Sequence, residues 1–375
     1  MARILIAWNQ TDEDVTTWWR RDGRRTPDWD SAKVVDPGDT VEEEMALIES
    51  ALVDVGHDVT VLNIRDSLDV LIDAVERLHP DAVLNLVEWF HDDIAHEYHL
   101  ASVFELLGVP YTGARPLALA LCQNKPHAKA LLAAAGVPTP KWRVVENVAA
   151  IGELKLAFPV IVKPAFEDAS GGIDAGSVVG DRPALDARVS HVVKEHRMPA
   201  LVEEFIAGRE IHCAVIGNAP TQSLPLFEME FKDAVGDDGR TLPRIITYRA
   251  KWDPFSRDYY AVESRCPAEV DDAVAARVQE IALRACRVLG TRDYARVDLR
   301  LDPVTNEPYV LEVNPNPDLA NGCAFAQCVR ASGRTYADAV VEIAEMALER
   351  GKAAARPPSP SDALLHEYLA RRGAK

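Results

Sequence analysis

The sequence predicts an α/β and α+β protein that opens with a doubly wound lobe, and three patterns support this fold class. Short apolar runs at 2–7, 57–62 and 81–87 have the length and composition of buried strands. Segments with helical spacing at 41–55 and 67–79 lie between them. This β-α-β-α-β order favours a parallel sheet, with a ligand in the crevice at the carboxyl ends of its strands.

Local signals mark the ends of the two helices in this lobe. Thr40 is an N-cap candidate followed by glutamates in the first turn, Gly56 follows the end of the first helix, and Pro80 stops the second helix. No GxGxxG motif follows the first strand. A dinucleotide site is therefore not expected, although the topology would allow one.

Residues 9–38 form a long polar connection between the first strand and the first helix, and they include Trp18, Trp19 and Trp29. Connections of this length are usually functional loops or disordered segments. Aromatic rings beside the arginines of this segment could close over a substrate. A loop that only packs on the surface of the lobe is an equal alternative.

The middle of the chain predicts a small α+β lobe. Helices are expected at 124–135 and 183–195, and strands are expected at 158–163 and 176–179. The lobe begins soon after Pro110 and ends near residue 200.

A third lobe, again α+β, is expected from Ala200 onward. It contains a long helix at 268–289 and a strand pair at 293–313. A Pro-rich linker and a short amphipathic helix at 362–372 end the chain. The chain thus divides into a Rossmann-like lobe on the substrate side, two further lobes and a tail, at 1–112, 113–199, 200–352 and 353–375.

The composition argues against nucleic acid or an anionic membrane as a partner. The net charge is -18 and the pI is about 5.0, whereas those partners require a concentrated basic face. The six cysteines show no CxxC pair, so neither a zinc site nor a disulfide framework is indicated. No apolar run reaches the length of a signal peptide or a membrane span, and we expect a cytoplasmic protein.

The strongest chemical signal is a predicted hairpin in the third lobe. Its strands read YARVDLRL and PYVLEVNPNP, and a strand period of two places Arg296 beside Asp298, and Glu312 beside Asn314. A turn near Val304 sets Asp298 opposite Glu312. Two facing carboxylates on apolar strands need a cation, and two acidic oxygens with one amide suit Mg²⁺ shared with phosphates. The alternative is a surface hairpin whose acids pair with arginine.

Two other segments carry weaker signals. VIVKP ends a strand near Lys163 and leads to small residues at 169–172, whose backbone N–H groups could approach phosphate closely. A plain glycine turn is an equal alternative. VEEFIAGRE places Glu203 and Glu210 around a turn between two strands, where they could hold adenine and a ribose hydroxyl or form only an acidic hairpin.

In their order along the chain, these segments resemble the ATP-grasp superfamily and, within it, the D-alanine–D-alanine ligase family, over about residues 80–345. The motifs that carry the resemblance are PYTG at 110–113, the helix from Lys125 ending in GVPTP, VIVKP, VEEFIAGRE, YRAKW at 248–252, CPAEV at 266–270, YARVDLRL and LEVNPNP. The resemblance implies an ATP-grasp fold, with the second and third lobes as its central and C-terminal subdomains.

The resemblance also implies a role for each matching residue. Arg296 would stabilise the tetrahedral intermediate, Lys251 would lie near the γ-phosphate, and Ser170 would belong to the loop that covers the phosphates. The implied metal ligands are Asp298, Glu312 and Asn314. The implied ATP-binding residues are Lys125, Lys163, Ser170, Gly172, Glu203, Phe205, Ile206, Glu210 and Leu311.

The amino-acid side of the predicted site departs from the family pattern. Ala169 precedes Ser170 where the family has two serines, Trp252 replaces a tyrosine, and the position of a carboxylate-binding serine aligns near Cys323. We therefore expect the activation chemistry to be kept and the substrates to differ from D-alanine. Candidate substrate residues are Glu88, Trp8 and Asn9, which lie at the crevice, and Trp252.

The predicted activity is that of an ATP-dependent carboxylate–amine ligase, which joins small amino-acid-like substrates through an acyl phosphate and uses ATP with Mg²⁺ or Mn²⁺. Alternatives are D-alanine–D-alanine ligase itself, a kinase and a non-catalytic nucleotide binder.

The segment 231–245 is the candidate loop that closes over the site and excludes water. His91, His96 and His99 are interpreted as surface or packing residues, because no carboxylate completes a metal set. The resemblance also suggests a homodimer.

Overall fold

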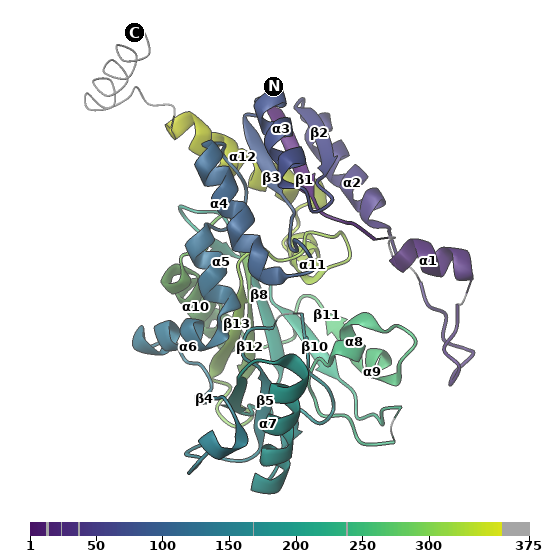
Figure 1. Ribbon diagram of the computed structural model, residues 1–375, viewed down its shortest axis with the longest axis vertical. Helices are drawn as coiled ribbons and strands as arrows, with labels where there is room; N and C mark the ends of the chain where they lie inside the picture. Colours follow the sequence, from purple (N-terminus) through teal and green to yellow (C-terminus); the bar gives the residue numbers. More distant parts are fainter. Residues whose placement is uncertain (13–14, 24, 37, 168, 238, 355–375) are drawn as a thin grey trace.

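The computed structural model describes residues 1–354 except 13–14, 24, 37, 168 and 238. The predicted terminal helix at 362–372 lies outside the described residues. Three β-sheets follow one another along the long axis of the molecule, with the N-terminal sheet at one end and a six-stranded sheet in the middle (Figure 1). Among the described helices, none combines the length and the apolar character that a membrane span requires.

The N-terminal sheet is parallel, as predicted, with the strand order β2-β1-β3. Its strands are β1 (Arg3–Trp8), β2 (Asp58–Asn63) and β3 (Ala82–Asn85), and its helices are α2 (Val41–Asp54), α3 (Leu68–Leu78) and α4 (Glu97–Leu107), the last preceded by the 3-10 turn η1 (Ile94–His96). Helix α2 begins with a capping box in which Thr40 and Glu43 exchange side-chain and backbone hydrogen bonds. The carboxyl end of β1, which is Trp8, points towards the middle of the molecule (Figure 1).

The connection at 9–38 differs from the expected loop because it contains a helix, α1 (Val15–Asp22). The first turn of this helix carries no acidic residue, so one of the usual sequence signals of a helix start was absent. Arg20 of α1 forms a bidentate pair with Glu43 of α2, at 3.0 and 2.9 Å. This ion pair connects the inserted helix α1 to α2.

A four-stranded antiparallel sheet forms the opposite end of the molecule, with the order β4-β7-β5-β6. Its strands are β4 (Trp142–Val145), β5 (Val160–Pro164), β6 (Val178–Val179) and β7 (Ala200–Glu204), and α7 (Arg182–His196) packs on it beside the 3-10 turn η2 (Val148–Ala150). Two helices, α5 (Pro116–Gln123) and α6 (Lys125–Ala134), connect the N-terminal lobe to this sheet. The predicted helices and strands of the middle region are all present.

The central sheet follows the order β11-β10-β8-β12-β13, with β9 paired to β8. Its strands are β8 (Glu210–Ile216), β9 (Gln222–Ser223), β10 (Phe227–Phe231), β11 (Val262–Arg265), β12 (Tyr294–Leu301) and β13 (Pro308–Asn314). The helices of this part are α8 (Tyr248–Trp252), α9 (Arg257–Tyr260), α10 (Asp272–Leu289) and α11 (Ala324–Ala331). Apolar residues of α10 pack against β8, β12 and β13, which leaves the other face of these strands for a site.

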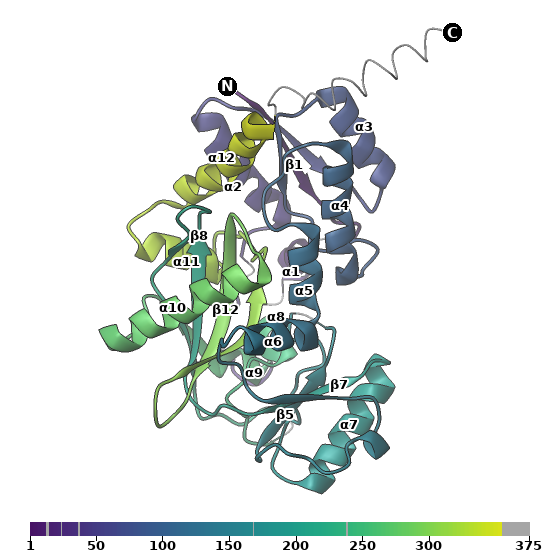
Figure 2. The same cartoon turned by 90° about the vertical axis from the view of Figure 1, so that its left-hand side faces the viewer.

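The last described helix, α12 (Tyr336–Ala354), returns to the N-terminal lobe and packs against α2 and β3 (Figure 2). One continuous core therefore contains Ile4 and Leu84 of the parallel sheet together with Ile343 and Leu348 of α12. The domain boundaries inferred from the sequence stay predictions. The packing of α12 nevertheless shows that the N-terminal sheet is buried on one face by a helix from the far end of the chain.

Candidate active site

A large cavity of about 530 Å³ lies between the four-stranded and the six-stranded sheets. Its wall includes residues of β5 and β7 on one side and of β8, β10, β12 and β13 on the other. Most of the predicted site residues line it: Glu88, Lys163, Ser170, Glu203, Phe205, Ile206, Glu210, Lys251, Trp252, Arg296, Asp298, Leu311, Glu312 and Asn314. Lys125, Gly172, Trp8 and Asn9 are not part of this wall.

The predicted hairpin of β12 and β13 forms one wall of the large cavity. Its register pairs Asp298 with Glu312, as expected, and also Arg296 with Asn314, and an irregularity follows Asp298. Arg296 donates two hydrogen bonds to the carboxylate of Asp298, at 2.7 and 2.9 Å. The arginine pair expected by the alternative interpretation is therefore present. Asp298 is only 6% exposed, however, so this hairpin does not lie at the surface.

Glu312 has a different cation as its partner. Lys125 at the start of α6 approaches it at 3.1 Å and also donates to the backbone carbonyl of Glu167 at 2.7 Å. The ammonium of Lys125 holds the pKa of Glu312 well below its usual range, against the opposing effect of burial. Lys125 thus reaches the site through Glu312, although it does not line the cavity.

The donor set of the hairpin fits Mg²⁺. Asp298 and Glu312 face each other, the low pKa keeps Glu312 ionised, and the amide of Asn314 lines the same wall. Among the described residues no group of three or more acidic, histidine or cysteine side chains is arranged to hold a metal ion by itself. Two carboxylates and an amide are the kind of partial oxygen shell that Mg²⁺ takes when it is shared with substrate phosphates.

A buried ion triad lies at the other wall. Glu203 is 1% exposed, and its two oxygens contact the ammonium groups of Lys129 and Lys163, each at 2.5 Å. Burial alone would raise the pKa of Glu203, but the two lysines outweigh it and the pKa lies below its usual value. The side chain of Glu203, expected at an adenine hinge, is thus engaged in holding the two lysines.

The predicted ribose ligand, Glu210, is also fully engaged within the protein. Arg300 donates to one of its oxygens at 3.1 and 2.9 Å, and His212 lies 3.4 Å from the other. Arg300 further donates to the carbonyl of Ile206 at 2.9 Å and its guanidinium lies 5.0 Å from the ring centre of Phe205. One arginine therefore organises the segment that was expected to hold the nucleoside.

The small-residue loop is arranged by unusual backbone conformations. Ala169 and Ser170 have φ values of 50° and 63°, in the left-handed region, and Ser170 lines the cavity. Gly172 turns away, because its carbonyl accepts a hydrogen bond from Arg188 at 2.8 Å. A Cβ at Gly172 would lie only 2.6 Å from atoms of the His196 ring, so this position requires glycine.

Helix α8 connects this loop to the opposite side of the cavity. Trp252 donates from its indole to the carbonyl of Ala169 at 3.1 Å, and the ammonium of Lys251 lies 4.9 Å from the ring centre of Trp252. The backbone N–H of Tyr248 donates to the carbonyl of Ile173 at 2.9 Å. The segment 231–245 contributes Ile245 to the cavity, and its closing motion stays a prediction.

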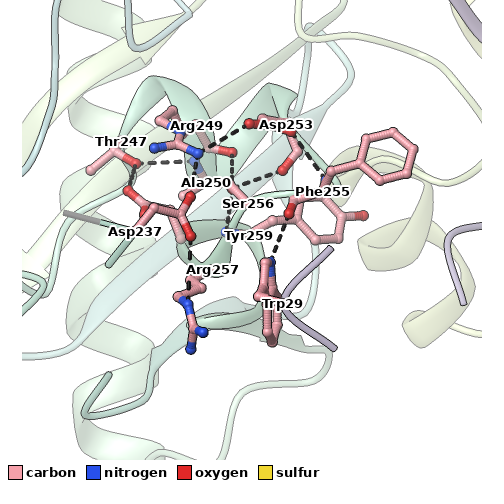
Figure 3. A network of polar contacts seen from close by, with 11 residues as sticks. Trp29, Asp237, Thr247, Arg249, Ala250, Asp253, Phe255, Ser256, Arg257 and Tyr259 are labelled. Atoms are coloured by element: carbon pink, nitrogen blue, oxygen red, sulfur yellow. Dashed lines mark hydrogen bonds and ion pairs between the residues drawn. The ribbon is translucent and has the colours of Figure 1, made fainter. Parts of the chain in front are cut away.

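The long insertion contacts the same helical segment (Figure 3). Trp29 donates from its indole to the carbonyl of Phe255 at 2.8 Å and meets the ring of Tyr260 edge-on, with ring centres 5.4 Å apart. Arg257 lies over the Trp29 ring at 4.8 Å. The insertion therefore reaches beyond the surface of its own lobe and contacts α9 and the residue Phe255 that precedes it.

A smaller cavity of about 210 Å³ lies beside the large one, at the carboxyl end of β1. Trp8, Asn9 and Glu88 line it, so three of the predicted substrate residues lie together. The amide nitrogen of Asn9 donates to Asp66 and to the carbonyl of Trp89, each at 2.7 Å. Asn9 therefore also fixes the loops around this cavity.

Three features of the site were not recognised in the sequence. Lys129 looks like an ordinary helical lysine, although its spacing of four from Lys125 places both on one face of α6. Arg300 alternates with Arg296 and Asp298 along β12, and this period of two was the signal that could have identified it. The contact of Trp29 with Phe255 had no local signal.

The three histidines pack together as interpreted from the sequence. His96 and His99 have ring centres 5.6 Å apart, and His91 lies 4.0 Å from Asp66. All six cysteines are free thiols.

Comparisons with known proteins show the family to which the chain belongs. A family model described as D-ala D-ala ligase C-terminus matches residues 131–345. The D-alanine–D-alanine ligase of Desulforudis audaxviator is 35% identical over 264 residues, which cover 69% of this chain and 80% of that protein. An uncharacterised protein of Sinorhizobium fredii is 33% identical over 313 residues, with coverages of 81% and 87%.

The fold is also shared with solved structures. The D-alanine–D-alanine ligase from Bacillus anthracis superimposes with a TM-score of 0.69 at 20% identity, covering 94% of this chain and 100% of that chain. The fold and the sequence relatives define an ATP-grasp enzyme, an ATP-dependent ligase that forms C–N bonds. The chain belongs to the D-alanine–D-alanine ligase family.

Proposed function

We propose that the enzyme activates the carboxylate of one amino-acid-like substrate as an acyl phosphate and transfers the acyl group to the amine of a second substrate, releasing ADP and phosphate. One observation carries this proposal. Arg296, Asp298, Glu312 and Lys163 line a single cavity of about 530 Å³, with Lys125 directly behind Glu312. Charged groups of this kind are needed where a phosphoryl group is transferred.

In the first step the substrate carboxylate attacks the γ-phosphorus of ATP, and the bond to the β-phosphate oxygen breaks. Lys125 and Lys163 would neutralise charge on the transferring group, and Lys251 would approach it from α8. Asp298, Glu312 and Asn314 would hold Mg²⁺, or Mn²⁺ in its place, which supplies further positive charge to the phosphates. The protein contributes mainly position and electrostatic stabilisation, because no side chain becomes covalently bound.

In the second step the amine attacks the acyl carbon, and the carbonyl oxygen gains negative charge in the tetrahedral intermediate. Arg296 would stabilise this oxyanion from its place on β12. Its bidentate contact with Asp298 holds the guanidinium in a fixed orientation at the cavity wall. The attack forms the C–N bond, and collapse of the intermediate breaks the C–O bond to phosphate and restores the carbonyl. The proton that the amine loses leaves with the released phosphate.

The substrates are expected to differ from the D-alanine that names the related ligases. The indole of Trp252 donates to the carbonyl of Ala169 in the small-residue loop. Cys323 is the N-cap residue of α11, and its thiol donates to the carboxylate of Asp318 at 2.9 Å. The kinase and the non-catalytic alternatives are not favoured by the relatives, which are named as ligases. The homodimer and the cytoplasmic location stay predictions.

The experiment is an assay of ADP and phosphate release with Mg²⁺ against pooled L- and D-amino acids and simple amines. Each positive pool is then analysed by mass spectrometry. A product that weighs the sum of an acid and an amine minus water supports the ligase. ADP release with a stable phosphorylated product, and no requirement for an amine, would instead indicate a kinase.

A further inference from the structure

The segment that follows β13 connects the proposed metal ligand Asn314 to the N-terminal lobe. Asn316 lies in this segment and lines both cavities. Its backbone N–H donates to Oδ1 of Asn314 at 3.3 Å. The oxygen of an amide has two lone pairs, so this bond orients the Asn314 side chain and leaves a lone pair for a cation. The orientation of Asn314 therefore depends on the position of the Asn316 backbone.

The side chain of Asn316 is held at both of its polar atoms by residues outside the central sheet. Its Oδ1 accepts from the backbone N–H of Ala114 at 2.8 Å, and its Nδ2 donates to Oε1 of Glu97 on α4 at 2.9 Å. A Cβ at Gly113 would overlap Oδ1 of Asn316, so the absence of a side chain at Gly113 admits this contact. These bonds determine which way the amide faces, because the opposite orientation would direct Nδ2 at a donor and Oδ1 at a carboxylate.

The carboxylate of Glu97 is itself fixed in position. Glu97 is 8% exposed, and its second oxygen, Oε2, accepts from the side-chain amide of Gln123 at 3.0 Å. The same nitrogen of Gln123 donates to the carbonyl of Ile94 at 2.9 Å. A continuous series of hydrogen bonds thus runs from α5 through Glu97 and Asn316 to Asn314.

We propose that Asn316 is a positioning residue for the metal site. Through its bond to Asn314 it sets the affinity of the hairpin for Mg²⁺, and through its bond to Glu97 it connects that affinity to the N-terminal lobe. The inference deepens the proposed function and rests on it, because it assumes the metal site of Asp298, Glu312 and Asn314. Replacing a group that orients a metal ligand commonly lowers metal affinity by about 10–100-fold.

The test reverses the direction of the hydrogen bond between Asn316 and Glu97. Asn316→Asp leaves two carboxylates facing each other, and Glu97→Gln turns an NH₂ group towards the donor of either Asn316 or Gln123. Each single variant therefore breaks one bond of the series. In the double variant, Asn316→Asp with Glu97→Gln, the new amide accepts from Gln123 and donates to the new carboxylate, which still accepts from Ala114. The double variant also keeps the net charge of the unmodified protein.

The measurement is the binding of Mn²⁺ in the presence of the β,γ-imido analogue of ATP, followed by electron paramagnetic resonance of the free ion, so that no turnover is required. We expect each single variant to weaken Mn²⁺ binding about tenfold, or about 1.4 kcal/mol, and the double variant to bind within about threefold of the unmodified protein. In the assay with pooled amino acids, the Mg²⁺ concentration that half-saturates ADP release should change in the same order. The kcat at saturating Mg²⁺ should change less.

Asn321→Asp is the matched control, because it makes the same change in charge and shape further along the same segment. The side chain of Asn321 accepts from Arg330 at 2.8 Å and lines neither cavity. A carboxylate there keeps this bond, so Asn321→Asp should bind Mn²⁺ as tightly as the unmodified protein does. Circular dichroism and Tm establish that each variant is folded.

The outcomes separate this inference from the proposed function. Unchanged Mn²⁺ affinity in both single variants would overturn the positioning role, even if the ligase is active. A loss that the double variant does not recover would also overturn it, because a general disturbance of the fold would then be the cause. If the unmodified protein binds no Mn²⁺ with the ATP analogue and its ADP release needs no divalent cation, the metal site of the proposed function fails together with this inference.

Discussion

At the scale of single residues, Arg296 is where the proposed chemistry is most directly tested. Its guanidinium lies at the cavity wall, held by Asp298. Arg296→Ala should lower kcat for ligation by about 10²–10³, the usual loss when a donor to an oxyanion is removed. ATP binding, measured as a thermal shift, should persist. Turnover within about threefold of the unmodified enzyme would remove Arg296 from the mechanism.

The buried triad predicts a large effect on stability. Glu203→Gln leaves Lys129 and Lys163 without the carboxylate that they contact at 2.5 Å. We expect a loss of about 3–5 kcal/mol in the free energy of unfolding, because a buried charge is left uncompensated. The neighbouring Glu204 meets Lys141 at 3.3 Å near the surface, so Glu204→Gln should cost at most about 1 kcal/mol. Urea unfolding of both variants checks the difference, and equal losses would contradict it.

The residues of the hairpin were identified from the sequence, as were Lys163 and Glu203 of the triad, but its third member, Lys129, was not. Asp298 and Glu312 face each other because strand period and turn position fix the register of a hairpin. Lys129 of α6 and Glu203 of β7 are 74 residues apart in the sequence and meet only in the tertiary structure, so no local pattern encodes their contact. Local periodicity therefore identified candidate residues, whereas their charge partners required the tertiary structure.

At the scale of elements, the contact of the insertion with α9 and with Phe255, which lies between α8 and α9, predicts a positioning role for Trp29. Trp29→Ala removes the hydrogen bond to Phe255 and the ring contact with Tyr260. We expect KM for ATP to rise about fivefold, since such contacts contribute on the order of 1 kcal/mol, while kcat changes less. Trp29→Phe keeps an aromatic ring and should give an intermediate KM.

Hydrogen exchange provides the structural measurement for this prediction. Amides at 248–260 should exchange faster in Trp29→Ala, whereas those of α10, which packs against β8, β12 and β13, serve as an internal control. Faster exchange throughout the protein would indicate general destabilisation and not a local role.

The cap of α2 predicts a pH-dependent contribution to stability. Hydrogen bonds from Arg20 and from the backbone of Thr40 lower the pKa of Glu43 from 4.5 to about 2. Because the folded pKa is the lower one, the stabilisation is complete above pH 4.5 and is lost as the pH falls towards 2. The difference in Tm between the unmodified protein and Glu43→Gln should shrink over that range. Glu42→Gln should show no such trend.

The elements themselves were largely predictable. The expected strands and helices of the first two lobes are present within a few residues, because apolar spacing and caps such as Thr40 determine them locally. The helix α1 and its contact across 226 residues of sequence, from Trp29 to Phe255, were not. Their position depends on packing between segments that carry no shared pattern.

At the scale of the whole molecule, the two cavities lie where separate parts of the chain meet. Residues of the N-terminal lobe, such as Glu88, and residues that follow β13, such as Asp318, line both of them. A shift of the N-terminal lobe relative to the central sheet would therefore alter both cavities as well as stability. Helix α12 opposes such a shift, because its apolar residues belong to the core of the N-terminal lobe.

The ion pair at the end of α12 tests whether these parts unfold together. Arg350 contacts both oxygens of Asp293, at 2.5 and 2.7 Å, and Asp293 is fully buried and also accepts from the N–H of Gly113 at 2.9 Å. Arg350→Ala should cost about 3–5 kcal/mol of unfolding free energy, whereas Arg334→Ala, which breaks a more exposed pair with Glu342, should cost at most about 1 kcal/mol. Because the core is shared, urea unfolding of Arg350→Ala should remain a single transition in both circular dichroism and fluorescence. Two separate transitions would mean that Arg350 joins lobes that are stable on their own.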